Sequence, residues 1–112
     1  MKSLISKIKK FNDAIKSISI DDVYHYDAST SSSHRYVVWA EEAESDSLVL
    51  NNHLDEQVIK GSVDLFTKKE FDSLVDEIQE TMDNNDISFS LFNVQYETET
   101  GYIHYTWNWE VS

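Results

Sequence analysis

Histidine is the side chain that most often performs acid–base chemistry near neutral pH, and this chain has four histidines. They are His25, His34, His53 and His104, and they share no recognisable spacing of catalytic or metal-binding side chains. Cysteine is absent, which excludes a thiolate zinc site, and the two glycines are too few for a glycine-rich phosphate loop. We therefore expect no enzymatic activity and no catalytic, cofactor-binding or metal-binding residues.

Four carboxylates lie close together in one short acidic stretch, namely Glu41, Glu42, Glu44 and Asp46. Hard cations such as Mg²⁺ or Ca²⁺ prefer several oxygen ligands, and a loop of this kind could supply them. The spacing does not match an EF-hand, and a solvated acidic loop is the simpler interpretation. We therefore predict no metal here and treat these residues as candidates for a protein interface.

The net charge of −12 is distributed unevenly along the chain. The first sixteen residues carry +4, from lysines that include Lys7, Lys9 and Lys10, whereas the remainder carries −16. Such acidity repels phosphate backbones, so we expect no nucleic-acid binding by the main body. Three interpretations stay open, which are ordinary solubility, a surface that must not adhere to nearby DNA, and a surface that imitates DNA.

Length and hydropathy predict one compact domain over residues 1–112, because 40% of the residues are hydrophobic and domains of this size are common. The N-terminus has basic residues but neither an apolar run nor a cleavage site, so we expect no secretion signal. No stretch approaches the roughly 18 apolar residues of a membrane span. We expect the chain in the cytoplasm and off the membrane.

The first half of the chain predicts one helix followed by strands. Apolar residues recur there at steps of four and three, as on one face of an amphipathic helix, at Leu4, Ile8, Phe11, Ile15 and Ile18. We predict this helix over residues 1–18, with lysines on its other face. Residues 23–26 are typical of a short strand or an extended lead-in, residues 35–41 of a strand, and the polar stretches 27–34 and 42–56 of flexible loops.

A second strand is predicted from Gln57 to Phe66, where Gly61 indicates a bulge or a close approach of the backbone. The sequence Thr67-Lys68-Lys69-Glu70 then fits a capping box, with Phe66 and Phe71 at the staple positions. An apolar stripe continues from there to Met82. We therefore predict the central helix over residues 68–82.

The clearest signal is a β-hairpin over residues 87–112, turning at residues 97–101. Alternation places the following residues on the buried face of its second strand: Ile103, Tyr105, Trp107, Trp109 and Val111. His104 falls on the polar face, where we expect a hydrogen bond to a neighbouring strand. The apolar phase of the first strand shifts near Leu91, which predicts a β-bulge.

These elements predict an α+β fold. Its sheet is mostly antiparallel, with about four or five strands, and the N-terminal helix and one central helix pack on it in the order α-β-β-α-β-β. No internal repeat is visible.

Several of these segments resemble a family of small proteins encoded in the structural gene blocks of prophages and long-tailed phages of Gram-positive bacteria, between the head-completion and tail-tube genes. The matching residues are 36–41, 61–72, 75–79, 93–97, 101–105 and Trp107, so the resemblance covers most of the chain from Val23 onward. It implies a tail terminator, tail-completion or head–tail joining protein with an α+β fold. Such proteins form a ring at the head-proximal end of the tail tube.

The resemblance therefore implies a virion structural protein whose partners are further copies of itself, the tail-tube protein and the head-completion protein. It would be located in the host cytoplasm during assembly and afterwards in the tail or neck of the virion. An acidic surface lining the ring would let the genome slide without binding. Alternatively, Lys7, Lys9 and Lys10 pair with acidic loops of the next subunit. The competing hypothesis is a cytoplasmic inhibitor that mimics the charge of DNA.

Overall fold

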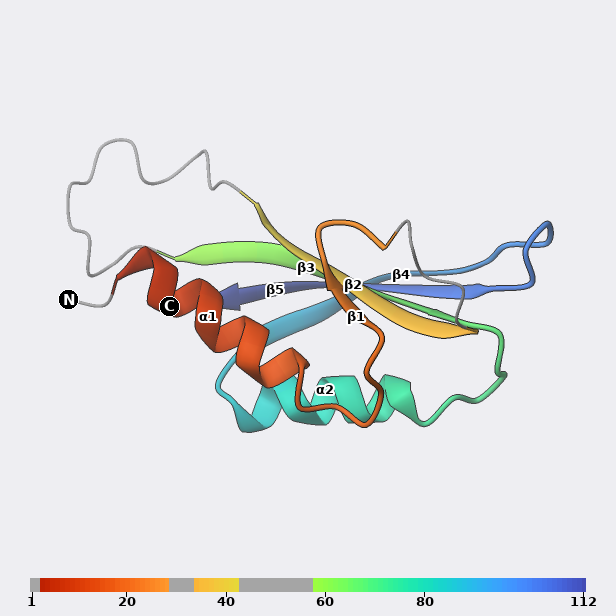
Figure 1. Cartoon of the computed structure of the whole chain (residues 1–112), viewed down its shortest axis with the longest axis horizontal. Coiled ribbons are helices and arrows are strands. Elements are labelled where there is room, and N and C mark those ends of the chain that lie inside the picture. Colours follow the sequence, from red (N-terminus) through yellow and green to blue (C-terminus); the bar gives the residue numbers. More distant parts are fainter. Residues whose placement is uncertain (1–2, 29–33, 43–57) are drawn as a thin grey trace.

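The computed structural model describes residues 3–28, 34–42 and 58–112. Its elements, in chain order, are α1 (Leu4–Ile15), β1 (Val23–His25), β2 (Arg35–Glu42), β3 (Ile59–Thr67), α2 (Leu74–Asn84), β4 (Ser88–Tyr96) and β5 (Ile103–Val111) (Figure 1). The strands form one sheet in the order β1-β2-β3-β5-β4, in which β1 runs parallel to β2 and the other pairs are antiparallel. The predicted α+β fold is confirmed, and the undecided segment 23–26 contributes strand β1.

Both helices lie on the same face of the sheet (Figure 1). The Phe11 ring of α1 stacks on Trp109 of β5 at 3.9 Å between centroids and lies 5.1 Å from the ring of Trp39 in β2. The indole N–H of Trp107 donates to Gln79 of α2 at 2.9 Å. We call this side the helix face, and the other side, which neither helix covers, the open face.

The predicted hairpin is confirmed, and the side chains of its second strand alternate as expected. Trp107, Trp109 and Val111 are almost completely buried on the helix face, while Asn108 and Glu110 between them are exposed. The pairing of β4 with β5 shifts between Leu91 and Asn93, which is the bulge that the change of apolar phase predicts.

Helix α1 is shorter than the predicted span of residues 1–18. It begins after Ser3, whose hydroxyl accepts a hydrogen bond from the Ser6 amide at 3.0 Å, and it ends at Ile15. The hydroxyl of Ser17 donates to the carbonyl of Ala14 at 2.6 Å, so a side chain satisfies a carbonyl of the last turn. Most of the predicted stripe packs inward, but Leu4 at its start is 42% exposed.

The predicted start of the central helix is wrong. Helix α2 begins at Leu74 rather than at residue 68, because Thr67 is still paired in β3, with Arg35 on one side and Ile103 on the other. Residues 68–73 form turns, and Phe71 adopts a left-handed φ of 57° that leaves its side chain 89% exposed. The pattern Thr67 to Glu70 therefore forms neither a capping box nor a hydrophobic staple.

Asp72, the residue before the N-cap Ser73, accepts the first backbone amide of α2. Its carboxylate accepts hydrogen bonds from the amide of Leu74 at 2.9 Å, from the Thr67 hydroxyl at 2.6 Å, and from Arg35 through two nitrogens at 2.7 and 2.9 Å. Its side chain is fully buried. Asp72 thus joins the first turn of α2 to the ends of β2 and β3.

Gly61 marks a close approach of neighbouring strands within the sheet and not a bulge, since the pairing of β3 with both neighbours runs through it without a shift. A Cβ atom at this position would lie 2.2 Å from the Ala40 carbonyl oxygen and 2.3 Å from the Trp109 ring. Only glycine leaves room for the indole to lie on the strand.

Replacing Gly61 with alanine should lower the free energy of unfolding by about 2–3 kcal/mol, because Trp109 must shift out of the core. Gly101→Ala is the matched control, since Gly101 has a φ of 79° but nothing within 4 Å of the added atom. We expect this control to lose only about 1 kcal/mol. Urea unfolding followed by tryptophan fluorescence measures both values, and equal losses would contradict the close-approach argument.

The Asp72 cluster should make stability depend on pH. Burial alone would raise the pKa of Asp72, but hydrogen bonds from Arg35, Thr67 and Leu74, with the charge of Arg35, lower it below its ordinary value of 3.8. The carboxylate therefore stabilises the fold fully above about pH 4, and this contribution is lost as the pH falls through the lower folded-state pKa.

We expect Asp72→Asn to lower the free energy of unfolding at pH 7 by about 2 kcal/mol and to flatten its fall in acid. Glu70→Gln is the control, because Glu70 is exposed and should change stability by less than about 0.5 kcal/mol. Urea titrations between pH 2 and 7 compare the variants. A larger loss of stability for Glu70→Gln than for Asp72→Asn would show that Glu70 does take part in a capping box.

Candidate interaction surfaces

Aromatic side chains from β2, β3 and β5 form a cluster on the open face. The rings of Tyr36 and Phe66 stack at 4.7 Å between centroids, and Phe66 stacks on the ring of His104 at 4.0 Å. The ring of Tyr102 is nearly perpendicular to the rings of Tyr36 and Phe66, and the ammonium of Lys68 lies 5.0 Å from the centroid of the Tyr102 ring. We call these residues the aromatic cluster. Its four rings are half-buried and remain accessible from outside the sheet, and Lys68 is exposed.

A polar cluster adjoins it and joins β3 to β5. Oδ1 of Asp64 accepts a hydrogen bond from the Thr106 hydroxyl at 2.7 Å and lies 2.9 Å from Nε2 of His104. The other ring nitrogen of His104 lies 3.6 Å from the carboxylate of Glu97 at the end of the hairpin. The expected hydrogen bond of His104 to a neighbouring strand is therefore present.

A threonine, a histidine and an aspartate in contact invite comparison with a nucleophilic relay. In such a relay the hydroxyl and the carboxylate occupy opposite nitrogens of the imidazole. Here both lie at Nε2, since the Thr106 hydroxyl is 3.2 Å from the nitrogen that also contacts Asp64. That nitrogen donates to the carboxylate and cannot also take a proton from Thr106. The contacts link two strands and do not form a relay.

A shallow hollow of about 390 Å³ lies next to these two clusters. Tyr36, Asp64, Phe66 and His104 line one side, and residues 26–28 after β1 line the other. Aromatic walls beside a carboxylate favour the side chain of a cationic partner over an anion.

The three predicted interface lysines differ in how far the structure exposes them. Lys9 is exposed and Lys10 is half-buried, but Lys7 is only 3% exposed and has an interaction partner within the protein. Lys7 is therefore not exposed for contact with another subunit, whereas Lys9 and Lys10 remain candidates for an interface. Position 7 shares a helix side with Phe11 and Ala14, at steps of four and three, and the apolar stripe read from Leu4 obscured this relation.

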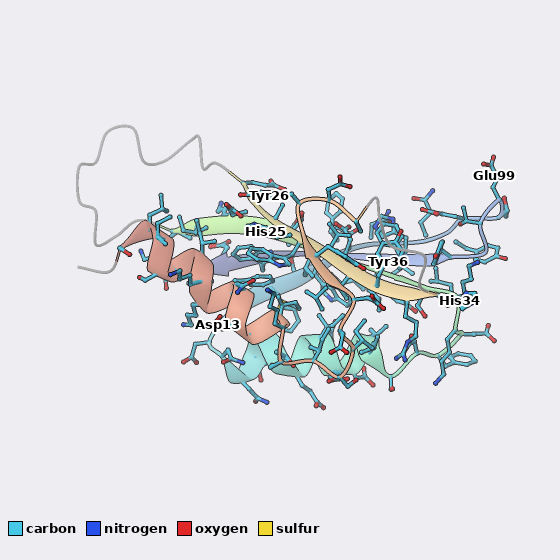
Figure 2. The ribbon with its side chains drawn as sticks, in the orientation of Figure 1. Asp13, His25, Tyr26, His34, Tyr36 and Glu99 are labelled. Carbon is cyan, nitrogen blue, oxygen red and sulfur yellow. The ribbon has the colours of Figure 1, made fainter. Side chains whose placement is uncertain are left out.

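The four predicted acidic interface residues do not lie in one loop. Glu41 and Glu42 are the last residues of β2 and not part of a loop, whereas Glu44 and Asp46 lie outside the described residues. Burial alone would raise the pKa of Glu41, but hydrogen bonds from the Tyr26 hydroxyl and from His25, at 2.7 Å for the latter, lower it. Figure 2 shows His25 and Tyr26 next to each other at the end of β1.

Helix α2 carries a row of carboxylates that sequence reasoning did not single out. Asp76, Glu80 and Asp83 recur at steps of four and three and are exposed, and the helix contains no basic residue. Glu77 beside them accepts hydrogen bonds at 2.7 Å from the amide and the hydroxyl of Ser19. We call Asp76, Glu80 and Asp83 the acidic row. A helical-wheel test of the charges would have found it.

Within residues 3–28, 34–42 and 58–112, no helix is long and apolar enough to cross a membrane. Nor do these residues contain a group of three or more His, Cys, Asp or Glu side chains that could hold a metal ion.

The contact between Asp64 and Thr106 should be measurable as a coupling free energy. In a double-mutant cycle with Asp64→Asn and Thr106→Val, we expect about 1 kcal/mol of coupling in unfolding experiments. Asp64→Asn combined with Ser90→Ala is the control and should be additive, because Ser90 is an exposed residue of β4, two strands away in the sheet. Additivity in both cycles would show that the contact does not contribute to stability.

No family model matches the chain, and no curated protein matches it. The case for a function therefore depends on the surfaces described above and on the sequence resemblance.

Proposed function

We propose that this chain is a phage structural protein that acts in tail completion or termination, or in head–tail joining, as the subunit of a ring. Its partners are further copies of itself, the tail-tube protein and the head-completion protein. The resemblance of residues 23–112 supplies the class of protein. The observation that carries the proposal is the exposed acidic row of α2, a helix that lies on the opposite side of the sheet from the open face (Figure 1).

The acidic row gives the ring a physical purpose. If α2 lines the channel, each subunit directs Asp76, Glu80 and Asp83 toward the passing genome. A ring of such rows repels phosphates at short range, so DNA slides through without binding.

The remaining surfaces serve contacts between proteins. Lys9 on α1 is exposed and Glu42 at the end of β2 is exposed, so opposite charges are available for a heterologous contact that closes a ring. The hollow beside the aromatic cluster suits a cationic side chain of a neighbouring protein. Within the virion these contacts act by shape and charge, without a chemical step.

A second candidate, an inhibitor that mimics DNA, is favoured by the axial spacing of a larger set of carboxylates, which adds Glu77 and Asp86 to the acidic row. Asp76, Glu77, Glu80, Asp83 and Asp86 follow one another along α2 and the turn after it. At 1.5 Å of rise per residue they average roughly one charge per 4 Å, close to the 3.4 Å of a single DNA strand. Such a protein would bind a basic partner with an affinity that falls steeply with salt.

Mixing the purified chain with the tail-tube protein of the same phage distinguishes the two candidates. We expect rings in electron micrographs that cap one end of each tube and set its length, and a phage lacking the gene should make tubes of uncontrolled length. A tight one-to-one complex with a basic host DNA-binding protein, dissociated by salt and without capping, would support mimicry and contradict the ring.

Reversing the acidic row tests its role inside the ring. Asp76→Lys combined with Glu80→Lys and Asp83→Lys should still cap tubes but lower the titre of complemented phage by about tenfold or more, because DNA then binds the channel. The control reverses three exposed carboxylates elsewhere, Asp13, Glu99 and Glu110, with the same change in net charge. Equal titres for the two triple variants would show that α2 does not line the channel.

A further inference from the structure

Strand β4 forms one edge of the sheet. It pairs with β5 on one side, and no described strand pairs with its other side. The amide of Glu97 donates to the carbonyl of Tyr102 at 2.9 Å, which fixes the alternation of the ladder beyond the bulge. The N–H and C=O groups of Val94 and Tyr96 therefore point outward, toward the unpaired side. We call residues 88–96 the β4 edge.

The β4 edge lacks most of the features that keep edge strands from pairing. Natural edges carry charged residues or proline, or are short or bulged. The β4 edge has nine residues and contains neither a charged residue nor a proline. Its only protective feature of this kind is the bulge at Phe92.

Large apolar side chains on this edge are exposed. Leu91, Val94 and Tyr96 lie opposite Trp107, Tyr105 and Ile103, respectively, so all three belong to the helix face. They are nevertheless 50%, 49% and 60% exposed, and Phe92 at the bulge is 70% exposed. These exposures leave an apolar strip along an unpaired strand.

Charge and length indicate which strand pairs with it. Two copies of a chain with a net charge of −12 repel each other unless they meet where charge is absent, and residues 87–96 form an uncharged stretch of ten residues. The β4 strand of a second copy has the same nine residues, so the two strands match in length. The opposite edge, β1, offers only three and is flanked by Asp21, Asp22 and Asp27.

We propose that two copies of this chain associate in solution by antiparallel pairing of their β4 edges about a two-fold axis. The pairing joins two five-stranded sheets into one, and it places Leu91, Val94 and Tyr96 of both copies in a shared apolar layer on the helix face. The inference goes beyond the proposed ring and is independent of it, because it concerns the free chain and uses neither Lys9 nor the acidic row.

Sedimentation equilibrium over a concentration series tests the proposal. The full chain should approach twice its mass of 13.0 kDa at about 10–100 μM. Val94→Lys should raise the dissociation constant at least about tenfold, because two like charges then meet across the paired edges. Phe71→Lys is the matched control, since Phe71 is an exposed apolar residue at 89% but lies outside the sheet, and it should leave the constant unchanged.

Cross-linking provides a second readout that does not depend on affinity. The chain has no cysteine, so a single cysteine on the β4 edge can form a disulfide only with another copy. Among single cysteines at residues 92 to 96, we expect one or two to cross-link under mild oxidation, whereas Phe71→Cys should not. A monomer at about 1 mM, or a dimer that Val94→Lys leaves intact, would overturn the proposal, as would equal cross-linking at Phe71.

Discussion

The fold depends on the burial of three tryptophans between the sheet and its two helices. Trp39, Trp107 and Trp109 are almost completely inaccessible, and each indole removes on the order of 200 Å² from water. Phe11 of α1 stacks on Trp109, and Gly61 gives that indole room to lie on β3. The order of the strands, the position of α1 and the requirement for glycine at 61 all follow from this one packing arrangement.

Because the tryptophans lie on the helix face, the open face is available for polar contacts between strands. There Asp64, His104 and Thr106 link β3 to β5, and the aromatic cluster lies beside them without a helix above it. Asp72 performs a comparable function at the end of the sheet, where it joins two strands to the start of α2. Polar contacts therefore fix the relations between elements, whereas burial supplies most of the stability.

The surface that remains is divided by charge. The acidic row occupies the outer side of α2, the exposed lysine of α1 lies on another helix, and the β4 edge is neutral and apolar. A protein with this division can repel a polyanion at one surface while it binds proteins at others. That combination suits the ring subunit proposed above. Because the surfaces are separate, each can be altered by substitutions that leave the core intact.

Periodicity in the sequence was enough to predict the hairpin, its buried face, the bulge near Leu91 and the α+β class, because alternation and helical spacing are local properties. The start of α2 was not predictable in this way. Thr67 to Glu70 has the residue types of a capping box, but pairing with β2 and β5 keeps Thr67 in the strand. Asp72, which donors from β2 and β3 hold in place, accepts the first amide of the helix instead. Likewise, only the packing of α1 placed Lys7 inside, and only the strand order left β4 at an edge. Long-range pairing outweighs local propensity wherever a residue's partners come from distant parts of the chain.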